Sequence, residues 1–425
     1  MECGMRIESI ARKDVLRFMF LLLLFLIMIQ MAFNLSVQQA SFTVMSKWVQ
    51  VSDQLYSSSS RLAQLQPPRL GIPKGSPSAA SFHIEQSTQS VIKSDNNVTY
   101  ICSKNVINVT NKDCLPLCPV ISDKLVGDLA AYIDSPTYYD LDKLYPWVRD
   151  GGRGKPSYCY PRHRVAIIIP YRNRESHLRT FLYNIHPILY RQELDYGIYV
   201  VEQNGSSKFN RAMLMNIGFA EAMKIHDYQC FVFHDVDLIP ENDKNIYNCP
   251  KQPRHMSVAI DKFKYRLPFP RIFGGVTSLT VEQFQKVNGF PNRYFGWGGE
   301  DDDMWKRIHN AGYKVIRNAR EIARYKMIKH GKDKGNKDNP VRFKMLKYSD
   351  KYFKTDGINR LTYKVLKIEF NHLYTRVLVD IDEKEVMAVC KNILFEIKKV
   401  MTPSVSEEHS LIHTQVGNTE ECQKN

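Results

Sequence analysis

After Pro161, short apolar runs alternate with segments whose apolar positions follow a helical period. Short continuous runs rich in Val, Ile and Phe, bounded by polar residues, are typical of strands in a parallel α/β sheet. The pattern therefore predicts an α/β domain, with strands at Val165–Ile169, Ile198–Val201, Cys230–Phe233 and Ser257–Ile260.

Two helices are predicted together with their ends. Phe209–Lys224 has Asn210 as a suitable N-cap, and Asp301–Asn310 is followed by a terminating glycine, Gly312. The polar motifs PYRNR and DVD directly follow the first and third strands. Because ligands of open α/β sheets bind beyond the carboxyl ends of the strands, we expect both motifs to border a ligand site.

A different pattern occupies the N-terminus, where Phe18–Ile29 is an uninterrupted apolar run that resumes through Phe33 after Gln30. Sixteen residues span only about 24 Å of helix, so flanking residues as far as Val37 are expected to complete a membrane crossing. Basic residues precede the run, and the first charge after it is Lys47. The N-terminus should therefore stay cytosolic, which makes the chain a single-pass type II membrane protein.

A cleaved signal peptide is the alternative, with Ala40 as a possible cleavage site, although no small-x-small pattern closely follows the apolar core. From residue 38 to 113 the sequence is rich in Ser, Gln, Pro and Asn and has no sustained apolar period. We interpret it as a flexible stem. Asn97 and Asn108 begin glycosylation sequons in this stem.

Charge and cysteine content refine this picture. The chain of 425 residues has a formal charge of +15, and Arg317–Lys351 holds twelve basic and four acidic residues. Such a run could bind nucleic acid or anionic lipid, or be a solvated face, but a lumenal location excludes nucleic acid and favours a nucleotide diphosphate. With Cys3 on the cytosolic side, eight cysteines remain, which permits full pairing. The CxxxC spacing of Cys114 and Cys118 lacks a second half and so does not indicate zinc.

The candidate chemistry is concentrated in Arg271–Asp303, RIFGGVTSLTVEQFQKVNGFPNRYFGWGGEDDD. Glycines such as Gly275 let the backbone approach a ligand, Trp297 offers a flat face for a sugar ring, and the acids from Glu300 to Asp303 supply a base and hydrogen-bond acceptors. This combination indicates a carbohydrate-processing site. The alternative is a surface loop before an acid-rich helix start, since acids suit the N-terminal dipole.

Asp235-Val236-Asp237 places two carboxylates on one face of an extended strand, where they could hold a divalent ion against a diphosphate. The same spacing occurs elsewhere in the chain, so the pattern alone is weak evidence. Its position after a buried apolar strand and before Pro240 favours it.

Four ordered motifs resemble the β-1,4-galactosyltransferase family, which includes β-1,4-N-acetylgalactosaminyltransferases, and the similarity covers roughly Cys114 to Ile381. They are PYRNRESHL (Pro170–Leu178), FNRAMLMNIGF (Phe209–Phe219), FHDVDLIPENDKN (Phe233–Asn245) and the stretch Arg271–Asp303. The resemblance implies a glycosyltransferase-A type, Rossmann-like domain in the Golgi lumen. The domain boundaries we expect are 1–17 for a cytosolic tail, 18–37 for the signal anchor, 38–113 for the stem, 114–385 for the catalytic domain and 386–425 for a C-terminal extension.

The resemblance also implies disulfides and a metal site. It pairs Cys118 with Cys159 and Cys230 with Cys249, and elimination leaves Cys102 with Cys114 and Cys390 with Cys422. It assigns manganese to three protein ligands, the second Asp of the DVD motif and two residues of the KMIKH segment: Asp237, Met327 and His330. A thioether and an imidazole are softer than carboxylates and favour manganese over magnesium. From the residues alone, Met327 would be a core residue and His330 a surface one.

Donor contacts are implied for a set of residues that follow the strands or lie in the glycine-rich stretch: Pro170, Tyr171, Arg172, Arg174, Phe209, Arg211, Asp235, Val236, Lys262, Ile272, Gly275 and Trp297. Arginines suit a diphosphate because their planar fork donates two bonds at once, although a structural ion-pair face is the alternative. Asp301 is the expected general base, with Glu300 and Asp302 orienting the sugars. A helix cap is the alternative for Asp301.

Ile272 bears on the choice of donor. Members of the resembled family that use galactose carry tyrosine at this position, whereas those that use N-acetylgalactosamine (GalNAc) carry a smaller aliphatic residue. We therefore expect a manganese-dependent, inverting enzyme that transfers GalNAc from UDP-GalNAc to O4 of a terminal β-N-acetylglucosamine (GlcNAc) on glycoproteins or glycolipids, as in an invertebrate-type β-1,4-N-acetylgalactosaminyltransferase. The alternatives are a galactosyltransferase with the same acceptor and an inactive sugar-binding membrane protein.

Overall fold

The computed structural model describes residues 91–95, 98–102, 114–331 and 335–388, all within the compact unit Phe82–Asn425. The predicted membrane span at residues 18–37 and the sequons at Asn97 and Asn108 lie outside the described residues. Among the helices that are described, none has both the length and the apolar character needed to cross a bilayer.

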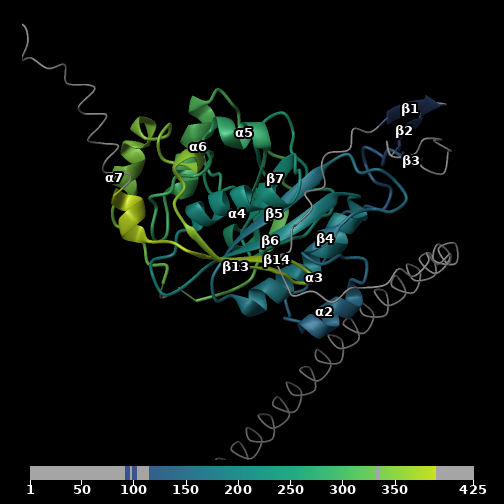
Figure 1. Ribbon diagram of the computed structural model, residues 1–425, viewed down its shortest axis with the longest axis horizontal. Helices are drawn as coiled ribbons and strands as arrows, with labels where there is room; N and C mark the ends of the chain where they lie inside the picture. Colours follow the sequence, from purple (N-terminus) through teal and green to yellow (C-terminus); the bar gives the residue numbers. More distant parts are fainter. Residues whose placement is uncertain (1–90, 96–97, 103–113, 332–334, 389–425) are drawn as a thin grey trace, which may run out of the picture. The chain divides into compact units, whose positions relative to one another are not determined.

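A central sheet of eight strands organises the described residues, in the order β13-β14-β6-β5-β7-β11-β9 with β4 beside β6 (Figure 1). The strands are β4 (Arg153–Gly154), β5 (Arg164–Tyr171), β6 (Asp195–Gln203), β7 (Cys230–His234), β9 (Arg254–His255), β11 (Val276–Thr280), β13 (Lys364–Phe370) and β14 (Thr375–Asp380). The four strands from β14 to β7 run parallel, and the strands at both edges are antiparallel. The predicted parallel sheet is therefore the centre of a mixed sheet.

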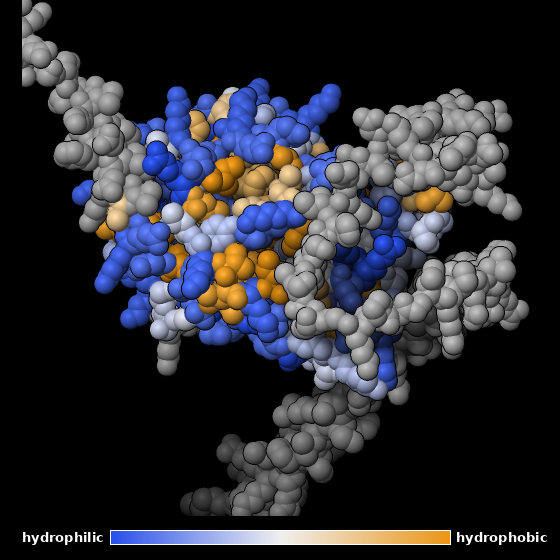
Figure 2. Space-filling model, viewed as in Figure 1, coloured by the Kyte–Doolittle hydropathy of each residue, from blue (hydrophilic) through white to orange (hydrophobic). Residues whose placement is uncertain are grey.

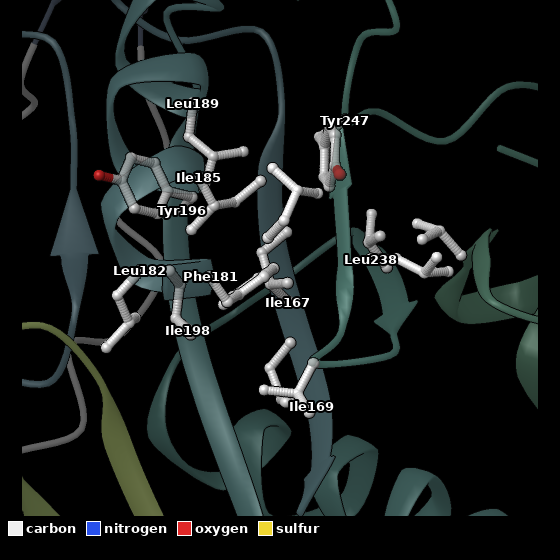
Figure 3. Packing of buried hydrophobic residues seen from close by; sticks show 14 of the residues in the cluster. Ile167, Ile169, Phe181, Leu182, Ile185, Leu189, Tyr196, Ile198, Leu238 and Tyr247 are labelled. Carbon is white, nitrogen blue, oxygen red and sulfur yellow. The ribbon is translucent and has the colours of Figure 1, made fainter. Parts of the chain in front are cut away.

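Alternate side chains of β5 enter two separate cores, which explains why its sequence is continuously apolar. Val165, Ile167 and Ile169 belong to one buried cluster, and Ala166 and Ile168 belong to the other. Figure 3 shows the first cluster, where Ile167, Ile169 and Ile198 of the sheet meet side chains from the helix at residues 175–191.

Helices cover both faces of the sheet, as the labels in Figure 1 show. α3 (Glu175–Arg191) packs on the first cluster, and α4 (Arg211–Ile225) packs on the second. Since β6 lies on one side of β5 and β7 on the other, the two crossovers run in opposite directions and leave a topological switch point between β5 and β7. The remaining helices are α2 (Tyr138–Leu144), α5 (Val281–Lys286), α6 (Glu300–Asn310) and α7 (Arg342–Lys347), with short 3₁₀ turns η2 (Asp261–Phe263), η3 (Ser349–Lys351) and η4 (Ile358–Arg360).

Two three-stranded sheets complete the described fold. One has the order β1-β2-β3, and the other has the order β10-β12-β8. Their strands are β1 (Val91–Asp95), β2 (Val98–Cys102), β3 (Cys114–Pro116), β8 (Leu238–Pro240), β10 (Ala259–Ile260) and β12 (Arg324–Met327). The second of these sheets joins the chain after β7 to a segment almost 90 residues later, because Met327 pairs with Leu238.

The predicted helices form with small shifts, and one predicted strand is corrected. α4 begins after Asn210, whose side chain accepts a hydrogen bond from the Met213 amide, as the predicted N-cap requires. The predicted strand Ser257–Ile260 is limited to β10, outside the central sheet, and the neighbouring β9 pairs with β11 instead. β11 was not predicted, because its sequence VTSLT alternates apolar and polar residues only briefly.

Both disulfides implied by the resemblance form, Cys118–Cys159 and Cys230–Cys249. Cys114 is disulfide-bonded, and its backbone lies opposite that of Cys102 in the β2–β3 register. Cys390 and Cys422 lie outside the described residues.

The face shown in Figure 2 is mostly hydrophilic, with apolar patches that include one over β13. β13 is the edge strand of the central sheet, and its Leu366, Ile368 and Phe370 are each about 40% exposed. Charged neighbours and a bulge between Val365 and Lys367 interrupt the strand. Both features oppose edge-to-edge association with other sheets.

His186 ties the first core to the loop before β14. The ring is fully buried, with Nε2 3.0 Å from the Leu373 carbonyl and Nδ1 2.9 Å from the Tyr196 hydroxyl. Burial lowers the pKa of His186 to about 3, so the ring stays neutral in the folded state and Nε2 carries the proton that is donated to Leu373.

We predict that the stability deficit of His186→Gln relative to wild type shrinks as the pH falls below 6.5. The unfolded wild-type histidine takes up a proton there and the folded one does not, so wild-type stability drops by about 1.4 kcal/mol per pH unit relative to the variant. Chemical denaturation of both proteins between pH 7.5 and 4.5 measures the difference, and contributions from other titrating groups cancel in the comparison. A deficit that is independent of pH would contradict a neutral buried ring.

Candidate active site

Most of the predicted donor residues lie at the carboxyl edge of the central sheet, beside the switch point. Pro170 and Tyr171 end β5, Asp235 and Val236 follow β7, and Arg211 opens α4. Arg172 and Arg174 occupy the turn between β5 and α3. The polar motifs PYRNR and DVD, which are separated by more than 60 residues, thus meet at one edge because their strands are parallel neighbours.

Arg211 connects three of the predicted acids. Its Nε donates to Asp235 Oδ1 and its Nη1 to Asp301 Oδ1, both at 2.7 Å, and Glu300 Oε1 lies 3.5 Å from Nη1. The fork geometry of the guanidinium allows one side chain to hold carboxylates from the end of β7 and from the first turn of α6. The structure therefore brings together the DVD motif and the four-acid motif.

The acids of this cluster have raised pKa values. Burial is the largest cause for each of the three, followed by opposing effects of Arg211 and of neighbouring carboxylates. The pKa of Asp235 and of Asp301 rises to about 6, and that of Glu300 to about 7. Burial and Asp303 also raise the pKa of Asp302. One guanidinium is thus surrounded by more negative charge than it neutralises.

Two consecutive glycines, Gly274 and Gly275, lie beside Asp301 and Asp235. A Cβ at Gly274 would collide with the Asp301 carboxylate, so any other residue here would displace it. Gly275 has φ of +78°, a conformation that favours glycine, and its carbonyl accepts a bond from the Asp235 amide at 3.0 Å. Ile272 lies half-buried in the same segment, and its amide bonds to Phe269.

The predicted metal ligands come from two adjacent strand ends. Asp237 Oδ2 and His330 Nε2 are 2.8 Å apart, and the Ile328 amide donates to the Asp237 carbonyl at 2.8 Å. β12 brings Met327 opposite Leu238, beside Asp237, and Met327 also packs on the first core. A carboxylate, an imidazole and a thioether at this point are a donor set that fits manganese.

Among the described residues, the only cluster of three His, Cys, Asp or Glu donors consists of Cys118, Cys159 and Glu193. The two sulfurs are joined in a disulfide and are not available as thiolate ligands. The Asp237 group is of a different kind, because its third member is a methionine.

Two loops meet beside the cluster. The Trp297 amide donates to the Lys337 carbonyl at 2.9 Å, and the Asn339 amide donates to the Trp297 carbonyl at 3.0 Å. Gly335 accepts bonds from the Phe209 amide at 3.1 Å and from Arg172 Nη2 at 3.0 Å. Backbone pairing therefore fixes the segment after residue 335 against predicted donor residues, while the Trp297 side chain stays 57% exposed.

Some predicted residues are not gathered into the cluster, and other residues join it without having been predicted. Lys262 is exposed, and its ammonium lies 5.9 Å from the Phe263 ring. His177 was not predicted, although its ring centroid is 5.9 Å from that of His330. It also lines an open cavity of about 620 Å³ together with Arg174 and Gly331. The sequence offered one signal for His177, its place one turn after Arg174 in the PYRNRESHL motif.

Residues 118–250 match the N-terminal region of glycosyl transferase group 7, and residues 254–331 match the N-terminal domain of galactosyltransferase. β-1,4-Galactosyltransferase 1 of Mus musculus is 51% identical over 270 residues, which cover 63% of this chain and 67% of the relative. The chain belongs to the β-1,4-galactosyltransferase family. Its mixed α/β domain is accordingly a glycosyltransferase-A type fold, and its activity is that of a group 7 glycosyltransferase.

Two further relatives of this family illustrate the range of the similarity. β-1,4-Galactosyltransferase 3 of Bos taurus is 49% identical over 269 residues, covering 63% of this chain and 68% of that protein. A crystal structure of a Drosophila β-1,4-galactosyltransferase 7 mutant in complex with manganese, UDP-Gal and xylobiose is 27% identical and has a TM-score of 0.46. That comparison covers 53% of this chain and 98% of the Drosophila chain.

Proposed function

We propose that this family member is an inverting, manganese-dependent enzyme that transfers GalNAc from UDP-GalNAc to O4 of a terminal β-GlcNAc on glycoproteins or glycolipids. The observation that carries the proposal is the convergence of Asp235, Asp301 and Glu300 on Arg211 beside the Asp237–His330 pair. We further propose that residues 18–37 anchor the chain in the Golgi membrane with the catalytic domain in the lumen.

Asp301 has the environment that a general base needs. Arg211 engages its Oδ1, Gly274 leaves room on the side of its Oδ2, and its side chain is 32% exposed, so an acceptor hydroxyl can reach it. In the proposed displacement, the acceptor oxygen bonds to the anomeric carbon, its proton passes to Asp301, and the bond to UDP breaks with its electrons on the diphosphate. A single displacement inverts the anomeric centre.

We predict that Asp301→Asn lowers kcat by at least about a hundredfold while UDP-GalNAc binding, measured by calorimetry, stays largely intact. The amide keeps the shape of the carboxylate and cannot accept the proton. Because the pKa of Asp301 is about 6, wild-type kcat/KM should fall as the pH drops below that value. Near-normal turnover of the variant would assign the base to another group, with Glu300 next. Asp302→Asn is the comparison variant, since Asp302 shares the same helical turn and has no contact with Arg211 among the described ion pairs. As a residue expected to orient the sugars, it should raise KM more than it lowers kcat.

Asp237, Met327 and His330 would hold the metal. When bound, manganese supplies positive charge that stabilises the departing diphosphate. The chain's own residues prepare this position: backbone pairing of β8 with β12 fixes the spacing between Asp237 and Met327, and the Asp237 carboxylate holds the His330 ring. The hydrogen bond with Asp237 is the largest cause of the raised pKa of His330, and the negative charge of Asp237 adds to it.

We predict that activity requires manganese, that magnesium substitutes poorly, and that Met327→His broadens metal use. Sulfur is a poor ligand for magnesium, whereas imidazole accepts a wider set of divalent ions. Initial rates of wild type and variant over a concentration series of each chloride salt would measure this. Equal wild-type rates with the two metals would refute the proposed ligand set.

The donor is the finer part of the proposal, because the relatives that match are galactosyltransferases by name. Support for GalNAc comes from Ile272, where the resembled galactose-using enzymes carry tyrosine. A tyrosine near C2 of the donor sugar would crowd an acetamido group, whereas isoleucine frees volume and offers an apolar wall to its methyl. Such a difference is worth about 1–3 kcal/mol in discrimination. UDP-galactose with the same acceptor is the alternative donor.

We predict that wild type has a higher kcat/KM for UDP-GalNAc than for UDP-galactose, and that Ile272→Tyr gains galactose transfer. Rates with both donors and a GlcNAc acceptor give the ratio. Ile272→Leu is a suitable control, since it keeps an aliphatic side chain of the same size and adds no hydroxyl. A wild-type preference for UDP-galactose would overturn the donor assignment and leave the family assignment unchanged.

A further inference from the structure

The segment Pro270–Gly275 contains Ile272 and packs against the Asp301 carboxylate at Gly274. It lies in no helix or strand of the described fold. Its conformation must therefore be fixed by contacts other than a sheet ladder. Alternate carbonyls along it, those of Pro270, Ile272 and Gly274, all accept hydrogen bonds from side chains outside the segment.

Arg317 supplies two of these bonds. Its Nη2 donates to the carbonyls of Pro270 and Ile272, each at 2.9 Å. Its Nε donates to Nδ1 of His255 at 3.1 Å. The planar guanidinium thus fixes two backbone positions and one imidazole in a single geometry, which a lysine ammonium cannot reproduce.

His255 connects Arg317 to the Gly274 carbonyl through its two ring nitrogens. Because Nδ1 accepts from Arg317, the proton of the neutral ring is on Nε2, which lies 3.0 Å from the Gly274 carbonyl. The Ser257 hydroxyl donates to the same carbonyl at 3.1 Å and accepts from the Val276 amide at 2.9 Å. Burial, followed by the charge of Arg317, lowers the pKa of His255 to about 3, so the bond to Gly274 persists at neutral pH.

We propose that Arg317 and His255 are positioning residues for donor selection, holding the Pro270–Gly275 backbone so that Ile272 and Asp301 keep a fixed separation. The proposal rests on the proposed role of Ile272 at the donor sugar. A small displacement of this backbone would change the space at the sugar C2 substituent and move the support of the base, and misplacement by about 1 Å can cost a hundredfold in rate. Neither residue needs to touch the donor.

Two substitutions of His255 distinguish the role of its Nδ1, which accepts from Arg317, from that of its Nε2, which donates to Gly274. In His255→Asn the side-chain oxygen can replace Nδ1 as acceptor for Arg317, and the bond to Gly274 is lost. In His255→Gln the amide nitrogen can replace Nε2 as donor to Gly274. His186→Asn is the matched control, because His186 is equally buried, has the same lowered pKa and also donates through Nε2 to a backbone carbonyl, that of Leu373.

The readout is the ratio of kcat/KM for UDP-GalNAc to that for UDP-galactose in the full-length protein, together with calorimetric binding of UDP and the thermal midpoint. We expect His255→Asn and Arg317→Lys to move the ratio toward one by about three- to tenfold, with UDP binding unchanged. His255→Gln should restore most of the wild-type ratio. His186→Asn should lower the thermal midpoint and leave the ratio unchanged.

Equal losses with both donors in His255→Asn and Arg317→Lys, or a change in thermal midpoint alone, would overturn the positioning role. A shift of the ratio in His186→Asn as large as that in His255→Asn would do the same. If wild type instead prefers UDP-galactose, the proposed donor is wrong. The ratio still tests the positioning role of Arg317 and His255, since a preference for either donor must weaken when the Pro270–Gly275 backbone loses these hydrogen bonds.

Discussion

The arrangement of the site depends on one half-buried cation, the guanidinium of Arg211, which bonds to Asp235 and Asp301 at 2.7 Å. Hydrogen bonds of the neighbouring residue set the position of Arg211. Asn210, the residue before it, donates from its backbone amide to Gln203 Oε1 and from its side chain to the Asn292 carbonyl. Helix α4 therefore begins at a point set by the end of β6 and by the loop that leads to α6, so that Arg211 joins three parts of the fold.

The charge balance around Arg211 follows from this placement. Three carboxylates share one guanidinium in a partly buried position, and burial raises the pKa of each acid. Such an excess of negative charge is costly in a protein interior unless a cation is added or a proton is taken up. The Asp237–His330 pair lies on the next strand end, where an added divalent ion would offset that cost.

A second buried network sets the direction of α6. Asp303 bonds to Arg307 at 2.7 Å and accepts from the Tyr294 hydroxyl at 3.0 Å, and Arg293 pairs with Asp356 at 3.1 Å. Four consecutive acids on a helix cannot share one face, because each step turns the side chain by about 100°. The network fixes Asp303 toward the core, so Glu300 and Asp301 are left to face Arg211.

The sequence by itself determined the local features of this protein. The period of apolar residues gave the central strands and α4 with its cap, and the order of the motifs, through their resemblance, gave the family, the two disulfides and the group of residues at the site. It did not determine which acids share Arg211, how β8 and β12 bring Asp237 and His330 together, or that the sheet is mixed. Nor did any local signal mark Arg317 and His255, because their roles consist of bonds to backbone carbonyls far away in sequence. Those relations required the tertiary structure, since hydrophobic periodicity records which side of an element is buried and carries no information about which distant polar group it will meet.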